Sequence, residues 1–233
     1  MDRSLRNSLV AEFIGTFLFI TIGAGAIVTQ TYQGADNSGL VGVALAHALA
    51  LGVLVSAFGA ISGGHLNPAV TLGVLTAGKI KAAPAAMYIV VQLVAAVLAG
   101  FFLRFVYPEA IWQPSHLGVP ALGADITPML GIAIEFVLTT VLVVVVFLTA
   151  VDGRAPKLGG LAIGLAIGAD ILFAGPLTGA AMNVARWFGP AVASGDFSNW
   201  YVWIVGPVLA GVAIGALWRW VLAEHHEPAA EAA

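Results

Sequence analysis

Residues 62–73 read SGGHLNPAVTLG, and residues 178–189 carry a related pattern, TGAAMNVARWFG. Each copy places an asparagine, Asn67 or Asn183, directly before a short apolar segment. Asparagine is a preferred N-cap residue, so each copy predicts the start of a helix. In a lipid-embedded chain, the irregular backbone before such a start must line protein or water. Two half-helix starts in one chain therefore favour a membrane protein with a pore near its midplane.

The composition excludes a soluble globular protein. Of the 233 residues, 60% are hydrophobic and 9% are charged, and the mean hydropathy is +0.99. In soluble domains, about 45–50% of residues are apolar and about 25% are charged. The absence of cysteine excludes disulfides and thiolate metal sites. The sequence also lacks a metal-ligand cluster, a nucleophile elbow and a phosphate-binding loop. We therefore expect an integral membrane protein that is not an enzyme, with no metal, no other cofactor and no nucleic-acid partner.

Six apolar runs are long enough to cross about 30 Å of hydrocarbon. They are residues 8–30, 39–60, 82–106, 127–151, 158–177 and 199–222. Two shorter segments, 67–78 and 183–194, follow breaks of glycine and polar residues and are read as half-helices. The first run follows Arg3 and Arg6 like a signal peptide, but it contains Glu12 and exceeds the usual apolar core of about 7–15 residues. The predicted fold class is an all-α membrane protein with six transmembrane helices and two re-entrant half-helices.

The internal repeat extends beyond the asparagine segments. AEFIGT surrounds Glu12, and IEFVLT surrounds Glu135 in the second half. Each half, approximately 1–106 and 127–223, contains three spans, and an odd number of spans inverts the second copy in the membrane. We therefore expect an inverted 3+3 repeat within a single transmembrane channel domain, 1–233, whose half-helices enter from opposite faces.

The basic residues predict the orientation. With both termini cytoplasmic, only Arg104 and Arg186 lie away from the cytoplasmic side, which agrees with the positive-inside rule. The basic residues on that side are then Arg3, Arg6, Lys79, Lys81, Arg154, Lys157 and Arg219. The tail, 224–233, is expected to be disordered.

The two asparagines predict a junction that excludes protons. An N-cap oxygen accepts a backbone N–H, so the NH₂ group of the same amide is left to face the space beyond the helix end. Two facing helix starts also present roughly half a positive charge each. A water molecule between them gives its oxygen to both amides and turns its hydrogens away in both directions. Protons then have no continuous path, and cations are repelled.

These segments resemble the aquaporins of the major intrinsic protein family, and the resemblance covers all six spans. Residues 44–51 and 168–182 are most similar to the tonoplast intrinsic subgroup of plants, whereas the short N-terminus and missing cysteine resemble bacterial or archaeal members. The resemblance implies an aquaporin-like fold and a passive channel for water and small neutral solutes in the cell (inner) membrane. It also implies a homotetramer in the lipid bilayer with one pore per subunit.

The resemblance further implies a narrow filter on the outer side. It assigns to this filter His47, Ile171, Ala180 and Arg186. Arg186 supplies donors and a fixed positive charge at membrane depth, where charges are usually functional. His47 is either a satisfied core residue or a pore-facing hydrogen-bond donor, and the resemblance favours the donor.

The filter residues predict a broad solute range. Strict water channels usually have Phe at the position of His47 and His at that of Ile171, so the filter here is expected to be wider. We expect it to pass ammonia, urea or hydrogen peroxide besides water, with glycerol the least favoured. Glycerol facilitators carry Asp after the arginine, whereas this chain has Trp187.

The pore motifs are Asn67-Pro68-Ala69 and Asn183-Val184-Ala185. Val184 replaces the usual proline, which presets the first helical φ; we expect a looser loop with little change in proton exclusion. Backbone carbonyls are expected to line the pore as acceptors. They belong to Gly63, Gly64, His65, Gly179 and Ala180.

Two buried carboxylates, Glu12 and Glu135, are expected to bind backbone N–H groups of the re-entrant loops, as the resemblance implies; the rival interpretation is a proton relay. Asp170 is expected to bind loop backbone, and the alternative is a cation or pH sensor. Two other functions stay open: an ion- or proton-coupled secondary transporter with inverted repeats, and a non-conducting structural protein. Osmotic swelling with low activation energy separates a channel from both.

Overall fold

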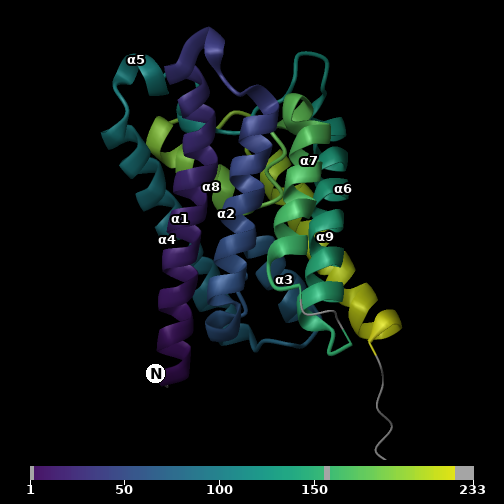
Figure 1. The fold of residues 1–233 in the computed structure, drawn as a ribbon. Coiled ribbons are helices and arrows are strands. Elements are labelled where there is room, and N and C mark those ends of the chain that lie inside the picture. Colours follow the sequence, from purple (N-terminus) through teal and green to yellow (C-terminus); the bar gives the residue numbers. More distant parts are fainter. Residues whose placement is uncertain (1–2, 155–157, 224–233) are drawn as a thin grey trace, which may run out of the picture.

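The computed structural model describes residues 3–154 and 158–223, and all regular structure within these ranges is helical. Figure 1 shows long helices running side by side across the molecule. The predictions for Lys157 and for the tail 224–233 lie outside the described residues. The long helices are α1 (Arg3–Gln33), α2 (Gly39–Ser62), α4 (Ala82–Val106), α6 (Pro128–Val146), α7 (Leu161–Thr178) and α9 (Val202–Leu217).

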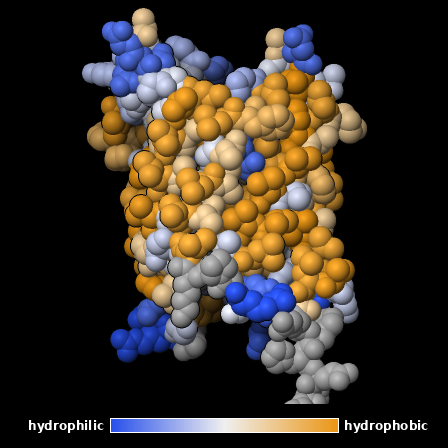
Figure 2. All heavy atoms as spheres, turned by 45° about the vertical axis from the view of Figure 1, so that its right-hand side comes forward, coloured by the Kyte–Doolittle hydropathy of each residue, from blue (hydrophilic) through white to orange (hydrophobic). Residues whose placement is uncertain are grey.

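Six segments in the described part of the chain are long and apolar enough to cross a membrane, which confirms the predicted spans. Their ends differ from the prediction by a few residues, because α1 begins at Arg3 and α7 at Leu161. Two spans continue as single π-helical turns, η3 (Phe147–Val151) and η4 (Trp218–Leu222). Figure 2 shows the result, an apolar band between polar rims.

The two half-helices are α3 (Pro68–Thr76) and α8 (Val184–Ser194). Figure 1 shows α3 in the half of the molecule nearer the N-terminus and α8 in the other half. We call the end at which α1 begins the N-terminal face and the other end the opposite face. Each half-helix packs against a span of the other repeat, α3 on α9 and α8 on α4. The two halves of the sequence are therefore interlocked.

Glycine makes these crossed contacts possible. A Cβ at Gly189 of α8 would collide with the carbonyl of Ala96 in α4, and a Cβ at Gly211 of α9 with the carbonyl of Ala69 in α3. Close backbone approach through small residues is a common way for helices to associate in lipid, where burial of apolar surface gives little driving force. The same contacts bring the N-terminal ends of α3 and α8 to the middle of the bundle.

The connection between α4 and α6 contains local structure that the sequence reading did not predict. A short helix, α5 (Glu109–Trp112), is followed by a 3₁₀ turn, η2 (His116–Gly118). A second 3₁₀ turn, η1 (Gly34–Asp36), lies elsewhere, between α1 and α2. The turn η2 packs against α1 and α8. It therefore lies over the start of the second half-helix rather than at the edge of the molecule.

Candidate functional site: a pore between two half-helices

The first re-entrant loop is held by Glu12 of α1. Its Oε1 accepts hydrogen bonds from Ser62 Oγ at 2.6 Å and His65 N at 2.9 Å, and its Oε2 from Leu66 N at 2.7 Å. Gln92 Nε2 of α4 adds a fourth bond at 2.8 Å. Glu12 is fully buried, so these donors replace the water that the carboxylate has lost.

The second loop is held in the same way by Glu135 of α6. Its oxygens accept from Thr178 Oγ1 at 2.7 Å, Ala181 N at 3.0 Å and Met182 N at 2.8 Å. Glu135 is also fully buried. Two of the donors to each carboxylate are backbone N–H groups of a re-entrant loop, so the carboxylates fix the conformation of the loops.

The loops share an unusual backbone conformation. Leu66 has φ 47° and Met182 has φ 53°, both in the left-handed region that such side chains rarely adopt. Gly64 has φ 62°, and its counterpart Ala180 has φ 44°. Strained residues of this kind persist where the surroundings over-determine them. Here the carboxylate bonds to the loop N–H groups supply that constraint.

Asn67 and Asn183 cap the two half-helices and bind each other's loops. Asn67 Oδ1 accepts from Ala69 N at 2.9 Å, while its Nδ2 donates to Met182 O at 2.9 Å. Asn183 Oδ1 accepts from Ala185 N at 2.9 Å, and its Nδ2 donates to Leu66 O at 2.9 Å. The sequence predicted that the whole NH₂ group of each asparagine faces the pore, but one N–H of each amide binds the opposite loop instead. One N–H per amide remains for a water molecule.

Arg186 lies in the first turn of α8 and is 2% exposed. Its Nε donates to His47 Nε2 at 3.2 Å, and its Nη1 donates to Gly118 O at 2.7 Å. The guanidinium is therefore held from two sides, by α2 and by η2, at the end of the pore near the opposite face.

The expectation that His47 donates a hydrogen bond to the pore is wrong. Its Nδ1 lies 2.8 Å from Val43 O, and a carbonyl can only accept, so Nδ1 carries the proton. Nε2 then accepts from Arg186, which leaves neither ring nitrogen as a donor to solutes. His47 contributes an acceptor that orients the guanidinium. Gly23 of α1 makes room for the ring, because a Cβ there would lie 2.6 Å from Nε2.

Two cavities lie on either side of the asparagine pair. The outer cavity, toward the opposite face, has a volume of about 430 Å³, and its lining includes His47, Ile171 and Gly179. The inner cavity, of about 10 Å³, is large enough for about one water molecule. Its lining includes Gly64, His65, Val70, Ile167, Asn67 and Asn183. The asparagine pair therefore borders the narrow inner cavity, and the wider outer cavity lies nearer the opposite face.

The remaining predicted residues take different places. Ala180 is 3% exposed and lies in the second loop, and Pro68 and Val184 are the first residues of α3 and α8. Gly63 does not line the two cavities formed by the described residues. Asp170 was expected to bind loop backbone, but it lies inside α7, and its Oδ2 has no hydrogen-bond partner among the described residues.

Three functional residues escaped the sequence reading. Gln92 binds Glu12 and also donates to Thr71 Oγ1 at 3.1 Å, and Thr71 in turn lies 3.1 Å from His65 Nδ1. The signal for Gln92 was available, since a lone amide in an apolar span usually has a role. Gly118 acts through its backbone carbonyl, for which the sequence carries no side-chain signal.

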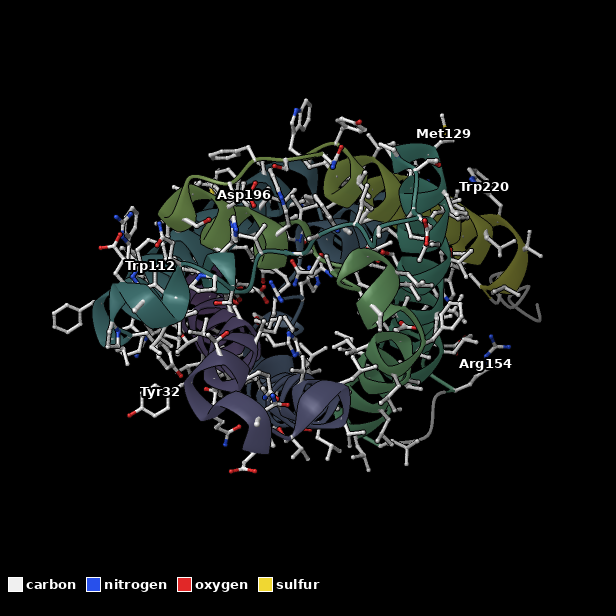
Figure 3. All side chains as sticks on the ribbon, turned by 90° about the horizontal axis from the view of Figure 1, so that it is seen from above. Tyr32, Trp112, Met129, Arg154, Asp196 and Trp220 are labelled. Carbon is white, nitrogen blue, oxygen red and sulfur yellow. The ribbon has the colours of Figure 1, made fainter. Side chains whose placement is uncertain are left out.

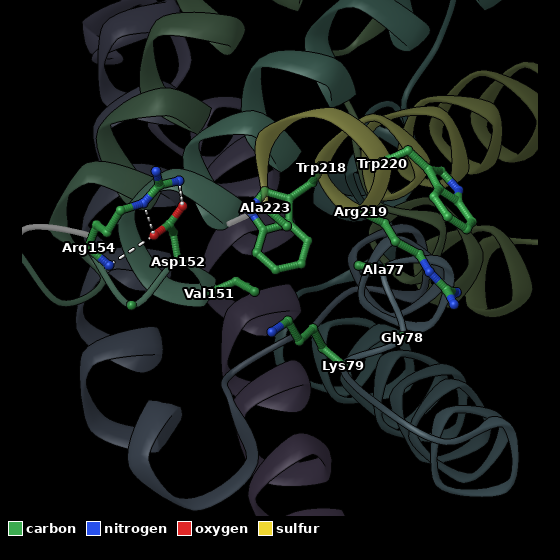
Figure 4. Close-up of a pocket in the computed structure, with 11 residues that line it drawn as sticks. Ala77, Gly78, Lys79, Val151, Asp152, Arg154, Trp218, Arg219, Trp220 and Ala223 are labelled. Atoms are coloured by element: carbon green, nitrogen blue, oxygen red, sulfur yellow. Dashed lines mark hydrogen bonds and ion pairs between the residues drawn. The ribbon is translucent and has the colours of Figure 1, made fainter. Parts of the chain in front are cut away.

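A larger cavity of about 700 Å³ opens at the ends of α3, α6 and α9, away from the asparagine pair (Figure 4). Among its lining residues, Asp152 and Arg154 form an ion pair of 2.6 Å. The hydrogen bonds from Arg154 hold the pKa of Asp152 below its usual range. In residues 3–154 and 158–223 no cluster of three His, Asp or Glu side chains could hold a metal ion.

Comparisons with known proteins agree with this architecture. The family described as "Major intrinsic protein" matches residues 2–218. "Probable aquaporin TIP2-1" of Oryza sativa subsp. japonica is 45% identical over 234 residues, which cover 97% of this chain and 91% of the relative. "Aquaporin TIP2-1" of Zea mays is 46% identical over 221 residues, which cover 91% of this chain and 86% of the relative.

A solved structure shows the same fold. The aquaglyceroporin from Plasmodium falciparum superposes with a TM-score of 0.80 at 23% identity, covering 94% of this chain and 97% of that one. The match to the family extends over nearly the whole chain, and the relatives are similar along nearly their whole length. This chain therefore belongs to the major intrinsic protein family.

Proposed function

We propose that the chain is a passive channel for water and small neutral solutes that excludes protons and ions. The observation that carries the proposal is the reciprocal bonding of Asn67 and Asn183, which brings two half-helix N-termini together beside the inner cavity. The similarity to plant proteins named aquaporin and to a solved aquaglyceroporin supports the same function.

The asparagine pair orients water. Each amide holds its helix through Oδ1 and the opposite loop through one N–H, so it cannot turn away. The second N–H of each amide donates to the oxygen of a passing water, and that water must point both hydrogens outward. Since the polarity of the water file reverses here, a proton cannot hop across, and the two helix dipoles repel cations.

The second constriction is a filter formed by His47, Ile171, Ala180 and Arg186. Arg186 offers its remaining guanidinium N–H groups to a neutral solute and repels cations. Ile171 is apolar and Ala180 is small. The filter walls that these two residues form are therefore apolar and leave more room for a solute. This combination favours ammonia, urea and hydrogen peroxide as solutes besides water. Glycerol is less favoured, because Trp187 rather than an acidic residue follows the arginine.

The protein is an integral multi-pass membrane protein, and we propose that it lies in the cell (inner) membrane with the N-terminal face in the cytoplasm. Most basic residues then lie on the cytoplasmic side. We further propose that residues 1–233 form one channel domain with one pore per chain and that four chains assemble into a homotetramer, which the family resemblance implies.

A secondary transporter is the less favoured alternative. Coupling to ions or protons needs titratable groups at the substrate site. Glu12 and Glu135 are fully buried and bind loop backbone rather than facing the cavities. The geometry therefore supports passive permeation.

The test is osmotic swelling of proteoliposomes followed by light scattering. We expect water permeability above that of empty vesicles, with a low activation energy and no proton leak under a pH gradient. Ile171→Trp should block this flux, because Ile171 lines the outer cavity. Leu172→Trp is the matched control, because Leu172 follows Ile171 in α7 but is 50% exposed and does not line the outer cavity. Flux with high activation energy, or uptake that depends on an ion gradient, would contradict the proposal.

A further inference from the structure

The turn η2 holds the filter arginine through its last carbonyl. Gly118 O accepts from Arg186 Nη1 at 2.7 Å, whereas the other contact to this side chain, from His47, is longer at 3.2 Å. Any movement of η2 therefore shifts an acceptor that fixes the guanidinium. What keeps η2 in place consequently affects the filter.

On the core side, η2 is fixed by its backbone shape and by packing. His116, Leu117 and Gly118 all have positive φ, of 47°, 56° and 73°. Leu117 is fully buried in the main hydrophobic cluster. A Cβ at Gly118 would lie 2.8 Å from the carbonyl of Ala24 in α1, so the turn sits directly on that helix. Three successive left-handed residues need such support from their surroundings.

On the surface side, η2 is fixed by a contact between two polar side chains. His116 Nδ1 lies 2.9 Å from Asp196 Oδ2, and Asp196 follows the end of α8. Figure 3, which views the bundle along its axis, places Asp196 beside α8. The other carboxylate oxygen, Oδ1, accepts from Ser198 N at 3.0 Å, which closes the turn after α8.

The pKa of Asp196 supports a stable contact. Partial burial raises this pKa, but hydrogen bonds from Ser198 and the proximity of His116 outweigh burial and bring it below its usual range. The carboxylate is therefore ionised at neutral pH. It accepts the Nδ1–H of His116 whether the imidazole is neutral or protonated.

We infer that His116 and Asp196 are positioning residues for the selectivity filter. Gly118 O links η2 to the first turn of α8. The His116–Asp196 pair links η2 to the segment that follows the end of α8. The helix that carries Arg186 and the turn that carries its hydrogen-bond acceptor are thereby held in a fixed relative position. Neither His116 nor Asp196 touches a solute.

The inference rests on the proposed channel function, and its test uses a ratio that channel yield does not affect. Urea and water permeabilities are measured on the same proteoliposomes, and their quotient is compared between variants. His116→Ala removes the donor. His116→Asn is the matched control, because its amide N–H can replace Nδ1–H and asparagine tolerates positive φ.

We expect His116→Ala to raise the ratio of urea to water permeability by up to about fivefold, the shift that one net hydrogen bond produces in a local equilibrium. His116→Asn should restore the wild-type ratio. Asp196→Ala should match His116→Ala, and the double variant should show no further change, because the two residues act as a unit.

Two outcomes overturn the inference. One is an unchanged ratio in His116→Ala with lower flux of both solutes, which indicates a purely structural role. The other is an additive effect in the double variant. Failure of the proposed function gives a different result, since wild-type vesicles would then be no more permeable to water than empty ones.

Discussion

The two re-entrant loops share one scaffold but carry different side chains. Glu12 and Glu135 bind them alike, and even the bonds from outside the loops correspond. Tyr88 OH donates to Ser62 O at 3.0 Å, and Trp203 Nε1 donates to Thr178 O at 3.0 Å. The symmetry is thus strictest where it determines the position of the two asparagines.

The loops differ just beyond the asparagines. Val70 of α3 corresponds to Arg186 of α8, and Thr71 corresponds to Trp187. The first loop therefore continues into a polar network of His65, Thr71 and Gln92, whereas the second continues into a cation. In α9, Pro207 takes the place of Gln92, four residues after Trp203 as Gln92 is four after Tyr88. The two loops therefore share their scaffold at the asparagines, and their side chains differ on the side of the second half-helix, where we propose that selectivity lies.

The largest expected effect is loss of the second loop's anchor. Glu135→Ala leaves three buried donors without an acceptor, at roughly 1–3 kcal/mol each, so we expect at least about 3 kcal/mol of destabilisation and loss of flux. Glu12→Ala frees four donors, and Gln92 Oε1, which has no partner among the described residues, can accept from one of them, so we expect a similar loss. Thermal unfolding in detergent measures both variants. A loss well below about 3 kcal/mol in either variant would show that the carboxylate is not the main anchor of its loop.

The second effect concerns selectivity. Arg186→Val makes the second half-helix resemble the first, in which Val70 holds the matched position. We expect the ratio of urea to water permeability to rise about tenfold, equivalent to about 1.4 kcal/mol less barrier. Proton exclusion should persist, because the asparagine pair is intact. The opposite result, proton leak with an unchanged ratio, would place selectivity at the asparagines.

A smaller effect is expected for the polar network of the first loop. Gln92→Leu removes the hydrogen bonds to Glu12 and Thr71 but leaves the other three donors to Glu12 in place. We expect about 1 kcal/mol of destabilisation and nearly normal water flux. Unfolding midpoints and swelling rates of the same preparation measure the two quantities. Loss of flux without loss of stability would assign Gln92 a direct role in the pore.

The smallest effect is expected where the second motif lacks its proline. Asn183 has φ −146° and ψ 115°, close to the φ −158° and ψ 122° of Asn67, which precedes Pro68. Such extended backbone suits a residue before proline. Val184→Pro should therefore stabilise the protein by about 0.4–1 kcal/mol without changing water flux or proton exclusion. A proton leak in the wild type that Val184→Pro abolishes would contradict this expectation.

The sequence predicted the spans and half-helices well, because long apolar runs and asparagine caps are strong local signals. It did not predict η2 or the short helix α5, since these depend on packing against α1 and α8 rather than on a local pattern. It also missed the exchange of amide hydrogen bonds between the loops. Backbone carbonyls such as those of Leu66, Met182 and Gly118 are present in every residue, and only the fold selects which of them bind.

The role of His47 was misjudged for a related reason. Its type and position indicated a donor near the pore, but hydrogen bonding fixes which ring nitrogen carries the proton. The carbonyl of Val43 and the guanidinium of Arg186 together leave an acceptor on Nε2. This information lies in the geometry of two other elements and cannot be read from residue type.

The central claim, that the filter lies only on the side of the second half-helix, is tested most directly by a single cysteine. The wild type has none, so Ala180→Cys introduces a unique thiol at the proposed filter, with Leu172→Cys, at an exposed position of α7, as the control. A charged, membrane-impermeant thiol reagent is applied to expressing oocytes, either outside or by injection, and swelling is recorded. We predict that Ala180→Cys loses water flux when the reagent is outside and keeps it when the reagent is injected, while the control is unaffected. Equal block from both sides, or no block from either, would contradict the account.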